Sequence, residues 1–93
     1  MSVAVKLPTQ LRSSVGGAAE VEVEPSGDDV GAVLEALFAS HPQLREQLAD
    51  DDGQLRRFVN VYVGGEDIRF SEGLATKVAD PGEIQILPAV AGG

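Results

Sequence analysis

The hydrophobic pattern of this chain changes its period within four residues, and this change restricts the fold more than any other feature. In residues 3–7 and 20–24, apolar side chains alternate with other residues, which is the two-residue period of strands with one buried face. After residues 26–29, the apolar side chains recur every three or four residues. We expect a polar, flexible connection between the two strands, containing Ser13, Ser14, Gly16 and Gly17. The chain therefore passes from a hairpin of two strands into a helix.

The helix is predicted to begin after Asp29, whose carboxylate can accept hydrogen bonds from the free amides of the first turn. Its apolar face consists of Val30, Val33, Leu34, Leu37 and Phe38. Pro42 should interrupt or restart the helix, because the residue before a proline avoids the α region. One or two further helical turns then bring Leu44 and Leu48 to the same side.

Three more strands are predicted in the second half of the chain. Residues 58–63 carry valines on one face and have apolar groups on the other, which indicates partial burial of both faces. Gly64 and Gly65 can take the positive φ angles of a hairpin turn, so residues 67–70 should fold back as a short strand. A loop or single turn over residues 71–78 precedes the last strand, residues 83–87.

The resulting element order is β-β-α-β-β-β. These are the elements of an α+β fold with a mixed five-stranded sheet and one main helix packed on one face. The ubiquitin-like β-grasp is the economical arrangement of this order. We expect one domain over residues 1–87 and a flexible tail over residues 88–93.

The composition restricts the partners that this domain can have. Hydrophobic residues make up 43% of the chain and aromatic residues 4%, so the core must be mostly aliphatic. Asp and Glu number 15 against 7 Lys and Arg, for a net charge of -8. Such a surface repels phosphate backbones and anionic membranes, so we expect no nucleic acid and no membrane partner. A basic protein is the favoured partner.

Several kinds of site are disfavoured by the residues that are present. The chain has no Cys, which removes disulfides, thiolate metal sites and thiol nucleophiles. Its one His, His41, has no Cys or second His with which to form a metal site, and residues 50–52 lack the spacing of a calcium loop, so no metal is expected. The alternating start does not resemble a signal peptide, and no stretch reaches the roughly 20 apolar residues of a membrane helix. We expect a cytoplasmic protein that is not an enzyme.

The last six residues, 88–93, are not predicted to contribute to the fold. Pro88 cannot donate a ladder hydrogen bond and is predicted to mark the end of strand pairing. Val90 and Ala91 extend the tail, and Gly92 and Gly93 let its backbone approach a reactive group closely. Six residues reach roughly 20 Å, enough to enter the active-site channel of a partner. The alternative is a frayed chain end.

Three further residues are candidate partner contacts. Leu87 should point away from the helix, opposite to Ile86, and exposed apolar residues on such a face often mark an interaction patch. Phe70 either belongs to this patch or caps the core. Arg69, together with Arg56 and Arg57, either frames the patch or is merely solvated.

Four stretches resemble the ThiS/MoaD family of ubiquitin-like sulfur-carrier proteins, and within it the CysO-type carriers of cysteine biosynthesis. They are residues 57–63, 66–70, 73–76 and 86–93. The resemblance implies that an ATP-dependent, ThiF/MoeB-like enzyme adenylates Gly93. Sulfur then replaces AMP to leave a thiocarboxylate. It implies no bound cofactor in the carrier itself, because the partner uses the ATP.

The resemblance also implies further partners. In a CysO-like pathway, the thiocarboxylate attacks an aminoacrylate on a pyridoxal-phosphate cysteine synthase, and a zinc-dependent JAMM-type peptidase releases the cysteine. Three alternatives remain open. They are a MoaD-like small subunit of molybdopterin synthase, a ubiquitin-like modifier joined to lysines, and a β-grasp interaction module with an inert tail.

Overall fold

Alternating apolar residues form five strands in the computed structural model, which describes residues 2–52, 54–56, 59–79 and 81–88. The strands are β1 (Val3–Lys6), β2 (Glu20–Val23), β3 (Val59–Val63), β4 (Glu66–Asp67) and β5 (Gly82–Pro88). The helices are α1 (Val30–Ser40), α2 (Pro42–Leu48) and the short 3-10 helices η1 (Thr9–Val15), η2 (Ile68–Phe70) and η3 (Gly73–Ala75). The predicted order of strands around one main helix is confirmed.

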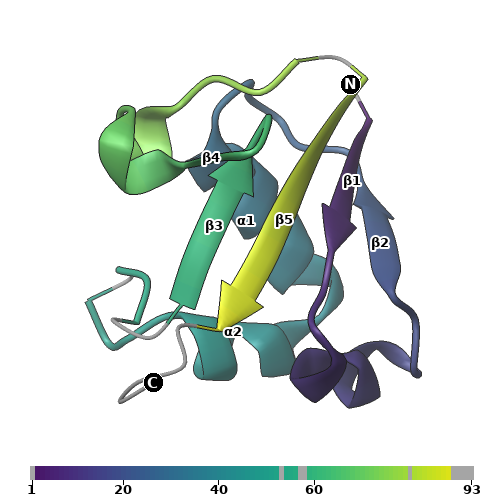
Figure 1. Cartoon of the computed structure of the whole chain (residues 1–93). Coiled ribbons are helices and arrows are strands. Elements are labelled where there is room, and N and C mark those ends of the chain that lie inside the picture. The colour runs from purple at the N-terminus through teal and green to yellow at the C-terminus, as the bar shows by residue number, and fades with distance from the viewer. Residues whose placement is uncertain (1, 53, 57–58, 80, 89–93) are drawn as a thin grey trace.

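The strands form one mixed sheet in the order β2-β1-β5-β3-β4. The last strand is therefore central, parallel to β1 and antiparallel to β3. Figure 1 looks onto one face of this sheet, with α1 crossing behind it. This is the predicted ubiquitin-like β-grasp. The first half of β5 pairs with β1, and its C-terminal end, from Ile86 to Pro88, pairs with β3.

The core lies between the sheet and the two α-helices. Of the apolar residues of α1, the five predicted to face the sheet are all buried. Leu44 and Leu48 of α2 are buried beside them. The buried residues of the described chain are aliphatic except for Phe38, as the composition predicts. The face of the sheet that carries no helix is hereafter the open face.

The start of α1 is stabilised by the side chain of Asp29 and by hydrogen bonds with the segment after η3. Asp29 caps it as predicted, because its Oδ1 accepts a hydrogen bond from the backbone N–H of Ala32 at 2.8 Å. His41 and Pro42 separate α1 from α2, as predicted, and Pro42 occupies the first turn of α2.

The segment after η3 is hydrogen-bonded to the start of α1. The N–H of Val30 donates to the carbonyl of Thr76 at 2.9 Å, and that of Val78 donates to the carbonyl of Asp28 at 2.8 Å. Lys77 Nζ lies 2.9 Å from Asp28 Oδ1. The hydrogen bond and charge of Lys77 lower the pKa of Asp28, and the same contact raises the pKa of Lys77.

The connection between β1 and β2 is more ordered than predicted. Residues 9–15 form η1 instead of a flexible loop, and Leu11 and Val15 pack against the core. Ser14 Oγ lies 2.9 Å from Gln47 Oε1 on α2. The prediction was wrong because Leu11 and Val15 pack against a surface of the core that exists only in the folded molecule.

The second hairpin is shorter than predicted. Gly64 and Gly65 have φ angles of 61° and 83°, which confirms their turn role. The return strand β4 has only two residues, and the predicted strand over 67–70 turns into η2 after Asp67. Residues 71–78 contain the single turn η3, as expected.

Strand boundaries differ from the predicted ones by a residue. β5 includes Gly82 and Pro88, and Pro88 is still paired, opposite Val59. Phe58, the predicted first residue of β3, lies outside the described residues. Among the residues that are described, no helix is long and apolar enough to cross a membrane.

Candidate functional site

The candidate site is the end of β5, where the chain leaves the sheet. Leu87 lies opposite Asn60 and Pro88 opposite Val59, so the strand is held to its last paired residue. The predicted tail residues Val90, Ala91, Gly92 and Gly93 lie outside the part of the chain that the structure describes. What the structure shows is the surface from which this tail extends.

Neighbouring side chains at the end of β5 have opposite environments. Ile86 is 1% exposed and faces the helices, whereas Leu87 is half-buried and faces the other way. The prediction that Leu87 points away from the helix is confirmed. Glu83 and Gln85, which share its face, are exposed.

A mainly apolar groove of about 400 Å³ adjoins this strand end. Its apolar lining comes from three parts of the chain, namely Pro8 and Leu11 before β2, Leu48 of α2, and Val59, Ile86 and Leu87 of the sheet. Glu46 and Arg56 supply charged groups to the lining. Sequence reasoning missed the contribution of Leu11, although its four-residue spacing from Val15 was a signal.

Asn60 brings a polar group to the open face beside Leu87. Its Oδ1 is buried and has no hydrogen-bond partner among the described residues. A buried acceptor without a partner is unfavourable by about 1 to 3 kcal/mol. Asn60 therefore leaves one buried polar atom unsatisfied directly beside Leu87.

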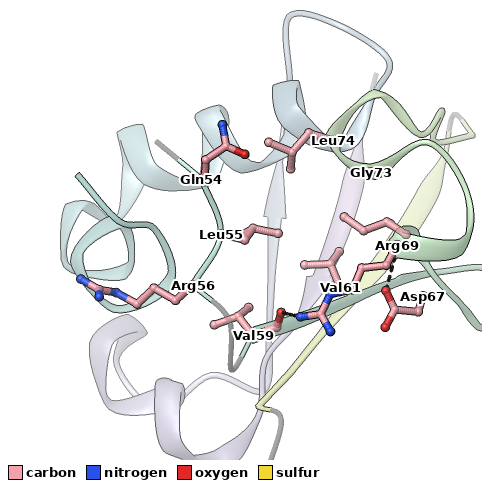
Figure 2. A pocket seen from close by; sticks show the side chains of 10 residues that line it. Gln54, Leu55, Arg56, Val59, Val61, Asp67, Arg69, Gly73 and Leu74 are labelled. Atoms are coloured by element: carbon pink, nitrogen blue, oxygen red, sulfur yellow. Dashed lines mark hydrogen bonds between the residues drawn. The ribbon is translucent and has the colours of Figure 1, made fainter. Parts of the chain in front are cut away.

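Arg69 connects η2 to the same end of the sheet. Its Nη2 donates to the carbonyl of Val59 at 3.0 Å, and its backbone N–H donates to Asp67 Oδ1 at 2.8 Å, as Figure 2 shows. The side chain therefore braces β3 at the residue opposite Pro88. The guanidinium that was predicted to frame a patch has a structural contact within the domain.

A second cavity, of about 480 Å³, lies between the segment after α2 and η2 and η3. In Figure 2 the side chains of Leu55, Val61 and Leu74 point toward it, and Arg56 points away. Gln54 and Asp67 add polar groups to its lining. This cavity is separate from the groove, although Arg56 and Val59 line both.

Phe70 does not cap the core, so that alternative is wrong. Its side chain is 82% exposed at the end of η2. It lines neither the groove nor the cavity. Arg69 thus binds the carbonyl of Val59 in β3, Leu87 lies opposite Asn60 on the neighbouring strand, and Phe70 is presented separately.

Metal-ligating residues are not clustered in the described ranges. No group of three or more His, Cys, Asp or Glu side chains among them could hold a metal ion. Asp50 Oδ1 instead accepts hydrogen bonds from the N–H groups of Asp52 and Gln54, at 2.9 and 3.0 Å, as in an ordinary turn.

The sequence matches the model of the ThiS family over residues 5–93. It is 50% identical over 95 residues to the sulfur carrier protein CysO of Mycobacterium tuberculosis, with each chain covered completely. The crystal structure of that CysO superposes with a TM-score of 0.82 and 49% identity, over 95% of this chain and 99% of the other.

Two further solved structures are similar to this chain. CysO of Amycolatopsis orientalis, crystallised in complex with BexX, is 42% identical with a TM-score of 0.83, over 98% of this chain and 99% of the other. SAMP1 of Haloferax volcanii is 34% identical with a TM-score of 0.84, and both chains are covered completely.

Proposed function

Because this chain belongs to the ThiS family and is a sulfur carrier rather than a catalyst, we propose that the carboxylate of Gly93 receives the sulfur. The observation that carries the proposal is the family match, which extends through the last two glycines. The pairing of β5 with β3 as far as Pro88 supports it, because the tail then begins directly after a paired strand residue.

The proposed reaction activates a poor acyl donor. A carboxylate oxygen of Gly93 attacks the α-phosphorus of ATP, and pyrophosphate leaves. A sulfide sulfur then attacks the acyl carbon of the adenylate, and AMP leaves with the carbon–oxygen bond electrons. The product is a thiocarboxylate. A ThiF/MoeB-like activating enzyme supplies the catalytic groups, and the reaction takes place in the cytoplasm.

Contacts of the folded domain provide the binding affinity for the partner, and the tail brings Gly93 into the partner's active site. Ordering the tail in a partner is unfavourable by about 1 to 2 kcal/mol per fixed residue, so contacts of the folded domain must offset it. Leu87 and the Asn60 oxygen lie at the base of the tail on the open face. We assign this surface to the partner. That a similar CysO was crystallised with BexX supports such docking.

Cysteine biosynthesis is the proposed pathway. The support is the 50% identity to CysO over the full length of both chains. A pyridoxal-phosphate cysteine synthase would accept the sulfur, and a zinc-dependent JAMM-type peptidase would then release the cysteine. The alternative of a molybdopterin synthase subunit stays a prediction.

A second candidate is a protein modifier. The small archaeal modifier protein 1 of Haloferax volcanii is 38% identical over 82 residues. In this function, the activated Gly93 would acylate a lysine of a target protein instead of taking up sulfur. The two functions share the adenylation step and differ in the nucleophile that follows.

Intact mass spectrometry of the protein from its own host separates the two candidates. A carrier gains the mass difference between sulfur and oxygen, whereas a modifier appears in larger conjugates.

Deletion of Gly93 should abolish thiocarboxylate formation with ATP, sulfide and the activating enzyme, while the urea midpoint stays unchanged. Thiocarboxylate formation by the shortened chain would show that Gly93 is not the acceptor.

A further inference from the structure

Phe70 is the exposed large hydrophobic side chain of the described residues, with 82% of its surface accessible. Single apolar residues are common on protein surfaces and need no function. Phe70 differs because the turn that carries it is held by several contacts, and because a place for its burial lies close by.

The first contacts form the turn itself. Ile68 is 4% exposed and anchors η2 in the core. Because a 3-10 helix has three residues per turn, an inward Ile68 directs Phe70 to another side. Asp67 Oδ1 accepts from the N–H of Arg69 at 2.8 Å, and the N–H of Ser71 donates to the carbonyl of Ile68 at 3.0 Å.

Two further contacts fasten the turn to its surroundings. Ser71 Oγ lies 2.8 Å from Glu66 Oε1, which ties the end of the turn to β4. Arg69 Nη2 donates to the carbonyl of Val59 at 3.0 Å, which ties its middle to β3 (Figure 2). The residues on both sides of Phe70 are therefore fixed.

The cavity of about 480 Å³ lies against the same turn, and Ile68 and Arg69 line it. Its apolar lining includes Leu55, Val61 and Leu74, yet the ring of Phe70 is outside it. Complete burial of a Phe side chain is favourable, because it removes a large apolar surface from water. The turn thus holds the ring where only another molecule can bury it.

We propose that Phe70 is an anchor that inserts into an apolar pocket of the ATP-dependent activating enzyme. This inference rests on the proposed function and names a second contact besides the tail. Arg69 joins the Phe70 turn to Val59, which pairs with Pro88 at the base of the tail. An interface of ordinary size covers about 800 Å² on each partner, which is large enough to include both the tail base and the Phe70 turn that Arg69 joins to it.

The charges around Phe70 define the border of that pocket. Glu66 and Glu72 are exposed on the two sides of η2, on a chain of net charge -8. Lysine or arginine residues should therefore border the pocket of the enzyme. Added salt should raise the KM for the carrier, because such contacts are screened.

The test measures ATP–pyrophosphate exchange by the ThiF/MoeB-like enzyme of the same host at varied carrier concentration. Phe70→Ala should raise the KM for the carrier about tenfold and leave kcat unchanged, as expected when a binding contact is lost. Its urea midpoint should match that of the wild type. Phe70→Leu, which keeps an apolar side chain, should restore most of the loss.

A second pair of variants tests the orientation of the ring. Asp67→Ala removes the acceptor for the N–H of Arg69 and should raise KM although Phe70 is present. Asp67→Asn keeps an acceptor oxygen and should behave like the wild type. An unchanged KM in Phe70→Ala, with active wild-type carrier, overturns this inference and leaves the proposed function standing. Failure of the wild-type carrier in the same assay overturns both.

Discussion

The two faces of the sheet differ in what their side chains do. On the face toward the helices, the valines and isoleucines of β1, β3 and β5 are at most 5% exposed, except for Val63 at the end of β3, which is partly buried. On the open face, Lys6, Glu83 and Gln85 are exposed, and Leu87 is half-buried. Ile86 and Leu87 are adjacent in sequence and belong to different faces.

This difference separates stability from binding. The covered face holds the fold together by excluding water, so its residues can change little. The open face contributes contacts such as that of Lys6 with Glu83, 3.5 Å apart and exposed to solvent, which stabilise weakly. Because the open face does not pack against a helix, it can present the base of the tail to a partner.

The largest effect on stability is expected at Ile86. Ile86→Ala should lower the free energy of unfolding by about 2 to 5 kcal/mol, because it leaves a cavity in the core. Urea denaturation measures it. The control is Gln85→Ala on the open face, which should change stability by less than about 0.5 kcal/mol. Equal losses for both variants would contradict the separation of the two faces.

A smaller effect on stability is expected at Leu87. Leu87→Asp should destabilise the domain less than Ile86→Ala, and should raise the KM for the carrier in the activation assay at least about fivefold. Gln85→Asp adds the same charge two residues away and controls for electrostatic repulsion. If Leu87→Asp instead lowered thermal stability as much as Ile86→Ala, Leu87 would belong to the core.

The smallest effect is expected from the pair of Asp28 and Lys77, which joins the segment before α1 to the segment after η3 and is exposed to solvent. The pKa of Asp28 lies below its ordinary 3.8, so its contribution to stability is present above that pH and is lost as pH falls through the lowered pKa. The pKa of Lys77 lies above its ordinary 10.5, so its contribution is present below that pH and is lost as pH rises through the raised pKa.

Thermal unfolding of the wild type and Asp28→Asn from pH 2 to 8 measures the acid limb. The difference in melting temperature should be constant above about pH 5 and shrink in acid. High salt should also reduce it. A difference that persisted unchanged at pH 2 would show that the charge of Asp28 does not contribute.

Local patterns were sufficient to predict several elements. The spacing of apolar residues in α1, the cap at Asp29 and the turn at Gly64 and Gly65 each depend on residues close in sequence. The face of Leu87 followed from alternation with Ile86. These features are determined by backbone geometry over a few residues.

The turn at Phe70 could not be predicted in this way. Residues 67–70 alternate as a strand would, and continuing the hairpin register would place Phe70 opposite Val59. In the structure, Arg69 Nη2 binds the carbonyl of Val59 instead, and the chain turns after Asp67. The side chain of Arg69 in η2 thus makes a contact with β3 where a longer β4 strand would have continued. The same holds for η1, whose Leu11 packs on a core built from distant segments.

The sequence by itself determined the kinds of elements, their order and the family, because periodicity and turn residues act locally and the family motifs are contiguous. Only the tertiary structure decided that the last strand lies in the centre of the sheet, parallel to the first. The tertiary structure also determined that Leu87 lines a groove, whereas Phe70 is exposed to solvent. These outcomes depend on contacts between segments tens of residues apart, whose free energy no local pattern contains.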